Sequence, residues 1–465
     1  MPRDLRRLFN PRSVVVIGAS RNPGAVGYGV LKGLHTGGFF PCVHGKPFPG
    51  KIYAVNPKAT NIQGIRSYPS INQVPGKPDL AIFCIPAKII PMVMQDCIKK
   101  GIKNAIIISA GFAEFGEQGK HLQAELKRII KGKVNVVGPN CLGVINTHSK
   151  MNASFGPTMP PVGHIGFITQ SGALADSIID WSVTERYGFS TLISFGNGMD
   201  LDAADYLEYL GRDPKTKAIT IYLEGISDGR KFMRIAKQVT KRKPVIVIKA
   251  GRTESGQKAI SSHTGSLAGS YKTYEAAFKQ CGVIVVDTVE ELFDTAKALS
   301  HQPPCKNGIA IITNGGGAGV LTADNCDVLG VKLTEFDELM LKRLDKTQKM
   351  HPAYSRRNPL DLVGDALPER YEAALDIVMS NKDVHGAIVL QTLQTMTDTV
   401  ADAKIVTKIH KKYPRKPIIC VYMGGKFSAA GVEFLEEHNI PDYNDPRKAA
   451  LAMKALIDRW ELLRS

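Results

Sequence analysis

The sequence predicts an α/β fold with parallel sheets, on the strength of three observations. Short β-branched runs alternate with amphipathic segments along all 465 residues, and strands that alternate with helices build parallel sheets. Glycine-rich turns follow several of these runs, where such sheets bind ligands. The chain is also too long for one hydrophobic core and fits about three domains. We therefore predict three doubly wound domains, over residues 1–150, 151–302 and 303–465.

Composition and charge indicate a protein that handles anions in a reducing compartment. Hydrophobic residues make up 43% and charged residues 22%, which is typical of a soluble globular protein. The net charge of +17 favours anionic partners, but no basic helix, zinc-finger spacing or ribonucleoprotein motif supports nucleic-acid binding. The eight cysteines never form C-x-x-C, and no run approaches the ~18 apolar residues of a membrane helix. We expect a cytoplasmic protein with free thiols, no metal-ligating cluster and no membrane span.

The first block has the usual start of a doubly wound nucleotide-binding sheet. A buried strand at 13–17 leads into a glycine-rich turn at 18–27 and then into a helix. Residues 39–50 hold three prolines and are expected to protrude as a loop before the second strand. Further strands are predicted at 51–55, 80–85, 104–109 and 135–137.

The second and third blocks repeat the alternation of strands and helices. The proline-rich stretch 157–161 precedes the second block, and the linker 301–304 precedes the third. A helix from about Pro446 to Leu462 follows the last strand. Strands are predicted at 165–169, 191–195, 218–223, 245–249 and 283–286 in the second block, and at 309–313, 387–391 and 418–422 in the third.

Polar and glycine residues follow four strands of the second block. Residues 170–173 open a helix after the first strand, residues 196–198 follow the second, and Glu224 follows the third. The fourth strand continues through 249–252 toward His263. A Ser-Gly helix start is a common cap and weak evidence alone, but the carboxyl ends of parallel strands share one edge. Together these strand ends predict an anion site, with Gln170, Ser171 and Gly172 as phosphate-binding candidates.

His263 lies in a loop-like stretch of small residues, Ser261–Gly269. Glycines such as Gly265 let the backbone approach a ligand, and turned N–H groups with hydroxyls make an anion-binding concavity. An imidazole there could take a phosphoryl group, or act as a base beside one. Its second ring nitrogen should then donate to a carboxylate, for which Glu224 is the candidate. The alternatives are a solvated surface histidine and an exposed glutamate at a strand end.

The third block opens with a second candidate for anion binding. After the strand at 309–313 come four glycines within six residues, at the start of a helix. Exposed backbone N–H groups and the helix dipole favour an anion there, whereas a tight turn would need only one glycine. If His263 carries a phosphoryl group, this helix start and the one at Ser171-Gly172 could hold its oxygens. The candidate residues are Asn314, Gly315, Gly316, Gly317, Ala318 and Gly319.

The first block predicts an adenine nucleotide other than NAD. Its turn is G-A-S-x-x-P-G-x-x-G instead of G-x-G-x-x-G, and Asn56-Pro57-Lys58 stands where a ribose-binding acid belongs. Lys58 would suit a phosphorylated ribose, which makes coenzyme A the natural candidate. The candidate binding residues are Gly18, Ala19, Ser20, Arg21, Pro23, Gly24, Gly27, Asn56, Lys58, Pro86, Ser109 and Ala110.

One apparent ATP motif is rejected. Residues 45–51 spell G-x-x-x-x-G-K, but Ile52 stands where a Ser or Thr would hold magnesium. Two prolines remove N–H donors, and the segment precedes a strand instead of following one. The sequence therefore shows no ATP site of its own.

These motifs, with the run 138–143 (G-P-N-C-L-G), resemble the α subunit of ADP-forming acetyl-CoA (acyl-CoA) synthetases, in the succinyl-CoA synthetase superfamily. The resemblance runs over nearly all of the chain in the same order. It implies a Rossmann-like CoA-binding domain followed by two flavodoxin-like ligase domains. It also implies that His263 is transiently phosphorylated, that Glu224 supports it, and that the two helix starts grip the phosphate.

The reaction implied by the resemblance is acyl-CoA + ADP + phosphate ⇌ acid + CoA + ATP, through acyl phosphate and phosphohistidine intermediates. A separate ATP-grasp β subunit would hold Mg²⁺ with ADP or ATP, in an α2β2 heterotetramer. Two alternatives stay open: a CoA-binding regulatory protein of the same fold, and a nicotinamide-dependent oxidoreductase. The presence of both His263 and Glu224 argues against the regulatory protein. The missing acid after the second strand argues against the oxidoreductase.

Overall fold

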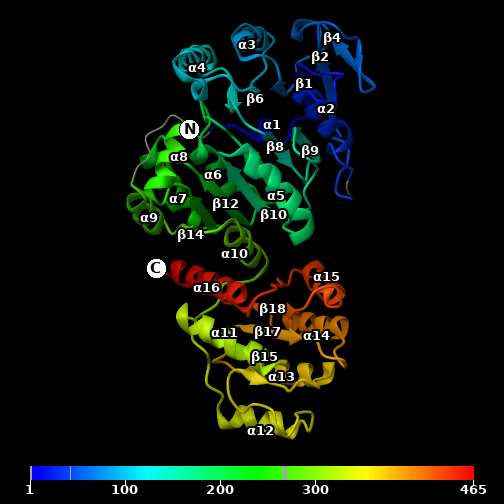
Figure 1. Ribbon diagram of the computed structural model, residues 1–465, viewed down its shortest axis with the longest axis vertical. Helices are drawn as coiled ribbons and strands as arrows, with labels where there is room; N and C mark the ends of the chain where they lie inside the picture. The colour runs from blue at the N-terminus through cyan, green and yellow to red at the C-terminus, as the bar shows by residue number, and fades with distance from the viewer. Residues whose placement is uncertain (1–2, 42, 265–269, 465) are drawn as a thin grey trace. The chain divides into compact units, whose positions relative to one another are not determined.

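The computed structural model describes residues 3–41, 43–264 and 270–464. The chain separates into two compact units, Met1–Asp287 and Thr288–Ser465, which are described one at a time. The fold is α/β, with three sheets whose strands are mainly parallel (Figure 1). No helix among the described residues is long and apolar enough to cross a bilayer.

The first sheet of unit 1 has the order β3-β4-β2-β1-β5-β6-β7, and only β3 is antiparallel to its neighbour. β2 and β5 lie on opposite sides of β1, so the connections diverge at the carboxyl ends, where open α/β sheets have their ligand crevice. The strands are β1 (Ser13–Ile17), β2 (Lys51–Val55), β3 (Asn61–Ile62), β4 (Ile65–Tyr68), β5 (Leu80–Phe83), β6 (Asn104–Ile107) and β7 (Asn135–Val137). The helices are α1 (Arg6–Phe9), α2 (Val26–Thr36), η1 (Ile71–Gln73), η2 (Ala87–Ile89), α3 (Ile90–Lys99), η3 (Ala113–Phe115) and α4 (Gly116–Ile130).

The second sheet of unit 1 has the order β14-β13-β12-β10-β11-β8-β9. β8 and β9 are antiparallel, and the remaining strands are parallel to one another. The strands are β8 (Gly143–Asn146), β9 (Met151–Ser154), β10 (Val162–Thr169), β11 (Phe189–Ser194), β12 (Ala218–Leu223), β13 (Val245–Lys249) and β14 (Ile284–Val285). The helices are α5 (Gly172–Glu185), α6 (Ala203–Arg212), α7 (Gly229–Thr240), α8 (Glu254–Thr264) and α9 (Tyr271–Gln280).

One hydrophobic core joins the two sheets of unit 1. It includes Val14 and Val16 of β1 together with Ile168 of β10 and Ile221 of β12, all fully buried. Helix α2 of the first sheet also packs against β9 of the second (Figure 1). Burial of this much apolar surface fixes the two sheets relative to each other. The positions of residues that follow strands of the two sheets can therefore be related to one another.

Unit 2 holds a parallel four-stranded sheet of order β16-β15-β17-β18. α10 belongs to this unit and packs against α16, and Lys297 of α10 forms a buried ion pair with Glu436 at 2.9 Å. The strands are β15 (Ala310–Thr313), β16 (Leu360–Asp361), β17 (Ala387–Thr392) and β18 (Ile418–Met423). The helices are α10 (Val289–His301), α11 (Gly316–Val328), α12 (Glu338–Lys346), α13 (Pro368–Ser380), α14 (Thr399–Lys412), α15 (Ala429–Glu437) and α16 (Pro446–Leu462).

The predicted strands and the helix at 446–462 are present, with ends shifted by up to a few residues. β8 and β9 were not predicted, because four-residue strands buried at every position carry no alternating pattern. Residues 39–50 protrude less than predicted: Phe48 is buried in the core, and its N–H donates to the Leu34 carbonyl. The three-domain division stays a prediction, since β8 lies in the second sheet and α10 packs within unit 2.

Candidate active site

A cavity of about 280 Å³ lies at the carboxyl edge of the second sheet of unit 1. Gln170 follows β10, residues 196–198 follow β11, and Glu224 follows β12, and all of them line it. The structure therefore brings together three of the four predicted strand ends. Ala113 and Glu114, which come after β6 of the first sheet, line the same cavity. The cavity thus joins the edges of the two sheets.

The side chain of Gln170 is hydrogen-bonded to the backbone at Glu224. Its Oε1 accepts hydrogen bonds from the N–H groups of Glu224 at 2.5 Å and of Gly225 at 3.0 Å. Glu224 itself is buried, with 8% of its surface exposed. This contact crosses from β10 to β12, which are neighbours in the sheet. Gln170 thus positions the backbone of Glu224, a role that was not predicted from the sequence. These two bonds use its amide oxygen and not its amide nitrogen.

Ser171 caps α5 directly after Gln170, although neither Ser171 nor Gly172 is among the residues that line the cavity. Its Oγ accepts from the Leu174 N–H at 3.2 Å, and α5 begins at Gly172. The first N–H groups of a helix have no partner within the helix and carry the positive end of its dipole. A Cβ added at Gly172 would meet nothing closer than 3.6 Å, so that position is not crowded. Phosphate binding at this helix start stays a prediction.

Lys249 is a buried cation beside Glu224. From the sequence it was predicted only to belong to a strand end. It is the last residue of β13 and pairs in register with Leu223, the residue before Glu224. Its Nζ donates to the Ala250 carbonyl at 2.6 Å and lies 4.6 Å from the centre of the Tyr274 ring. Burial lowers the pKa of Lys249, and the negative charge of Glu224 opposes that shift. The signal in the sequence was a lysine at the end of an apolar strand.

Glu114 was also missed by the sequence analysis. One carboxylate oxygen accepts from the N–H groups of Gly111 at 2.6 Å and Phe112 at 3.1 Å, and the other accepts from Asn197 Nδ2 at 2.6 Å. Asn197 also donates to Gln123 Oε1 at 2.9 Å, which ties the first sheet's turn to the second sheet. Burial would raise the pKa of Glu114, but the hydrogen bonds from Asn197 and from these N–H groups outweigh burial and lower it.

His263 lies in α8, and not in the loop that the sequence analysis expected. α8 runs from Glu254 to Thr264, with an acidic residue in its first turn. That acid suits the helix dipole, and the lysine, glutamine and alanine that follow favour a helix over the turn expected from the two serines. α8 packs against η3, the turn that carries Glu114. Gly265, the other candidate here, lies outside the described residues.

The coenzyme A candidates of the first block meet at the crevice beside β1. Gly18 has a φ of +92°, and a Cβ there would lie 2.4 Å from the Cys84 carbonyl oxygen. A Cβ at Gly27 would lie 2.0 Å from the Gly18 oxygen, so both positions require glycine. The turn can therefore lie flat against the sheet and leave its outer surface to a ligand. Arg21, Pro23, Gly24, Lys58, Pro86 and Ala110 are exposed around this crevice.

Polar side chains of this crevice hold its loops in place. Asn56 Nδ2 donates to the Ala19 carbonyl at 2.8 Å, and its Oδ1 accepts from the Lys58 N–H at 2.8 Å. Ser20 Oγ accepts from the Asn22 N–H, and Ser109 Oγ donates to the Ile85 carbonyl at 2.6 Å. The exposed cations Arg21 and Lys58 take no part in an ion pair within the described part of the chain. Coenzyme A binding at this edge stays a prediction.

The glycine run of unit 2 forms a helix start, as predicted. Gly315 caps α11, and residues 316–319 make its first turn. A Cβ at Gly315 would lie 2.7 Å from Thr392, whereas one at Gly317 would meet nothing within 4 Å. Asn314 is buried, and its side chain binds the end of β17: its Nδ2 donates to the Thr392 carbonyl and its Oδ1 accepts from the Thr392 N–H. Asn314 therefore fixes the turn. The N–H groups of Gly315 and Gly319 donate to Thr313 Oγ1 and to the Gly315 carbonyl, so the anion-binding prediction rests on those of Gly316, Gly317 and Ala318.

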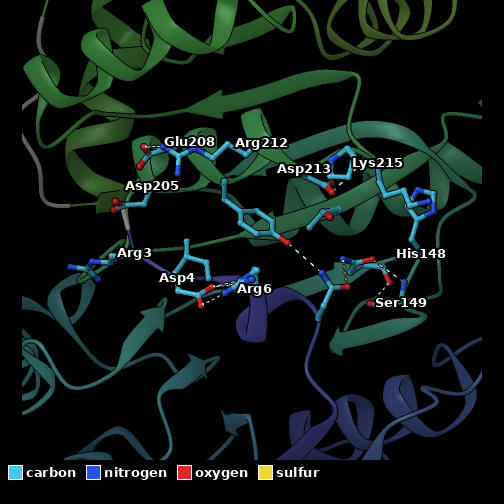
Figure 2. Close-up of a pocket in the computed structure, with 16 residues that line it drawn as sticks. Arg3, Asp4, Arg6, His148, Ser149, Asp205, Glu208, Arg212, Asp213 and Lys215 are labelled. Atoms are coloured by element: carbon cyan, nitrogen blue, oxygen red, sulfur yellow. Dashed lines mark hydrogen bonds and ion pairs between the residues drawn. The ribbon is translucent and has the colours of Figure 1, made fainter. Parts of the chain in front are cut away.

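A larger cavity of unit 1, about 710 Å³, has a different character. It lies between the N-terminal segment, α6 and the loop before β12, so it is at the amino end of that strand. Two ion pairs join its lining residues: Arg212 with Glu208 at 2.7 Å, and Arg6 with Asp4 at 2.9 Å (Figure 2). Ligands of open α/β sheets bind at the carboxyl ends instead. We place the candidate active site in the smaller cavity.

Three family models match the chain in succession. A CoA binding domain matches residues 12–147, a succinyl-CoA ligase like flavodoxin domain matches 162–299, and a ligase-CoA domain matches 309–463. Fold and site therefore define a CoA-binding ligase.

Relatives of known name place the chain more closely. The α subunit of acetate–CoA ligase (ADP-forming) II from Pyrococcus furiosus is 42% identical over 97% of both chains. Acetate–CoA ligase (ADP-forming) I from Archaeoglobus fulgidus is 43% identical over 97% of this chain, which spans 63% of that longer relative. A structure of acetyl-coenzyme A synthetase 1 from Ca. Korarchaeum cryptofilum, in complex with phosphate and ADP, has a TM-score of 0.91 and 38% identity, covering 99% of this chain and 98% of its own.

The chain belongs to the family of ADP-forming acetate–CoA ligases, in which it corresponds to the α subunit. The predicted family, fold class and enzyme class, an acid–thiol ligase, are thus confirmed. Membership also favours the catalytic interpretation over a regulatory CoA-binding protein.

Proposed function

We propose that this chain catalyses acyl-CoA + ADP + phosphate ⇌ acid + CoA + ATP, as the α subunit of an ADP-forming acyl-CoA synthetase acting on a small carboxylic acid. One observation carries the proposal: a single cavity is lined by the turn after β6 of the CoA-type sheet and by Gln170 and Glu224 of the second sheet. A thioester held in the first sheet's crevice can therefore reach the phosphoryl-transfer residues. The three predicted domains would divide this work.

The first sheet would hold CoA as a substrate. Gly18 and Gly27 let the turn after β1 pack closely against the end of β5 and the start of α2, and Asn56 fixes that turn from the next strand. Arg21 and Lys58 are exposed cations that would pair with its phosphates. Pro86, Ser109 and Ala110 would complete the wall along which the pantetheine arm runs.

Phosphate would attack the thioester carbonyl, which forms an acyl phosphate and releases the CoA thiolate. A neutral His263 imidazole would then attack phosphorus, breaking the bond to the acyl oxygen and releasing the acid as its carboxylate. Glu224 would accept a hydrogen bond from the other ring nitrogen, which fixes the tautomer and stabilises the developing positive charge. The N-terminus of α5 would offer N–H groups to the phosphoryl oxygens, and the N-terminus of α11 is proposed as the phosphate-binding helix start of unit 2.

The last transfer, from phosphohistidine to ADP, would use a separate ATP-grasp β subunit. That subunit would hold Mg²⁺ with the nucleotide, in an α2β2 heterotetramer. Two observations support a division of this kind: the 45–51 segment lacks the residues of a P-loop, and relatives of matching length carry the name of a subunit. Mg²⁺ would neutralise the nucleotide's phosphate charge during transfer.

The test is phosphorylation of the chain by γ-labelled ATP, with Mg²⁺ and the partner subunit. We expect an acid-labile, alkali-stable label that is lost in His263→Ala. His121→Ala is the matched control, because His121 is exposed on α4 and lies outside the cavity. Label that persists in His263→Ala would overturn the assignment of the phosphorylated residue.

A further inference from the structure

The small cavity carries more negative charge than the proposed chemistry, which uses Glu224, requires. Three carboxylates line it, those of Glu114, Asp202 and Glu224, and no Lys, Arg or His is among its described lining residues. Asp202 shares Lys231 with Asp205, at 3.0 Å and 2.7 Å, and Glu224 has Lys249 on the next strand. Glu114 has only neutral donors, the Asn197 amide and two backbone N–H groups. Among the carboxylates that line the cavity, Glu114 is the one with no described cation beside it.

The hydrogen bonds of Glu114 keep it ionised and immobile. Three N–H donors at 2.6–3.1 Å stabilise the charged form of the carboxylate, so that its pKa is lowered despite partial burial. Asn197 is itself held by Gln123, and η3 packs against α8. A carboxylate that lies beside Glu114 therefore meets a fixed negative charge that cannot turn away, whereas the phosphate of the proposed reaction would lie at the N-terminus of α5.

The acyl group has to enter this cavity if the proposed function is correct. The cavity is the space shared by the turn after β6 and by Gln170 and Glu224. The thioester carbonyl must lie between the CoA crevice and the residues of phosphoryl transfer, so the acyl chain extends beside it. A volume of about 280 Å³ suits a short acyl chain.

We propose that Glu114 is a specificity-determining residue, which excludes acyl groups that carry a second carboxylate. This inference rests on the proposed function, since it assigns the acyl group to the cavity of that reaction. Neutral short-chain acyl groups pass Glu114 without penalty. A dicarboxylic acyl group places two unpaired negative charges in one half-buried space, where repulsion between charges several ångströms apart is worth about ten- to a hundredfold in rate.

The experiment compares acyl-CoA substrates of equal length with the complete enzyme, chain plus partner subunit. Butyryl-CoA, succinyl-CoA and the neutral monoamide of succinyl-CoA share a four-carbon acyl chain, and release of the CoA thiol is measured with phosphate and ADP. For the wild type, we expect kcat/KM for succinyl-CoA to be at least about tenfold below that for the monoamide. In Glu114→Gln, the ratio of succinyl-CoA to butyryl-CoA should rise by about ten- to a hundredfold.

Glu117→Gln is the matched control, because Glu117 lies three residues away, is exposed, and pairs with Lys120 outside the cavity. This variant changes the net charge by the same amount and should leave the ratio unchanged. A wild type that uses succinyl-CoA and its monoamide equally overturns the inference, even if Glu114→Gln fails to fold. A ratio unchanged in an active Glu114→Gln also overturns it and leaves the proposed function intact. Absence of thiol release from every acyl-CoA would instead reject the proposed function, and the role of Glu114 with it.

Discussion

The two cavities of unit 1 differ in how their charged side chains are held, and that difference separates a reactive site from a surface hollow. The larger cavity, at the amino end of β12, contains partly exposed residues that neutralise each other in pairs. The smaller cavity, at the carboxyl edge, holds Glu114 and Glu224 on backbone segments fixed by hydrogen bonds. Charge that is immobilised next to substrate can act on it. Volume alone would have selected the larger cavity.

The strongest test of this contrast is to neutralise one glutamate in each cavity. Glu224→Gln should slow phosphorylation of the chain by about 100- to 1,000-fold, because a glutamine cannot stabilise the cationic imidazole of His263. Glu208→Gln, in the larger cavity, should leave the rate within about twofold. The initial rate of labelling by γ-labelled ATP measures both, with the partner subunit present.

CoA binding by Glu224→Gln should stay within about twofold of the wild type, since the crevice of the first sheet is unchanged. Equal labelling rates in the two glutamine variants would remove Glu224 from its role and abolish the distinction between the cavities.

Lys249 provides a second test through pH dependence. Lys249→Met removes a buried positive charge beside Glu224. Because burial lowers the pKa of Lys249, the wild-type lysine loses its charge at a lower pH than an exposed lysine does. The phosphorylation rate of the wild type should therefore fall along an alkaline limb that is missing in Lys249→Met, and near neutrality the variant should be about tenfold slower. The rate is measured from pH 6 to 10. A limb that stays in place, with an unchanged maximum, would show that Lys249 only fills space.

A third test compares Lys58, which follows the carboxyl end of β2 at the CoA crevice, with a lysine at the amino end of the same strand. Lys58→Ala should raise KM for acyl-CoA by about tenfold at low salt, because a cation that faces a phosphate is lost, and the difference should shrink as salt screens the charge. Lys51, at the amino end of β2, is also exposed, and Lys51→Ala should change KM by less than about twofold. Comparable changes in the two variants would mean that general surface charge, and not a site at the carboxyl edge, attracts CoA.

Much of the site could be predicted because its residues follow strands that the sequence marks clearly. Gln170 and Glu224 come directly after buried β-branched runs, and the topology of a parallel sheet brings them to one edge. The bond from Asn197 to Glu114 joins two sheets through residues 83 positions apart, and no local pattern encodes such a contact. The four-residue strands β8 and β9 escaped for a related reason, since only their place in the second sheet defines them. The helix that carries His263 shows that small residues alone do not specify a loop.

The smallest effect is expected in the larger cavity itself. Arg212 and Glu208 form an i,i+4 pair on α6, and 54% of the arginine side chain is exposed. Solvent screens such a pair, so Arg212→Ala should reduce the free energy of unfolding by about 0.5 kcal/mol and leave kcat/KM within about twofold. Urea unfolding and steady-state rates measure the two quantities. A fall in kcat/KM of tenfold or more, at unchanged stability, would mean that the cavity at the amino end takes part in the reaction, and that paired surface charges do not mark an inactive region.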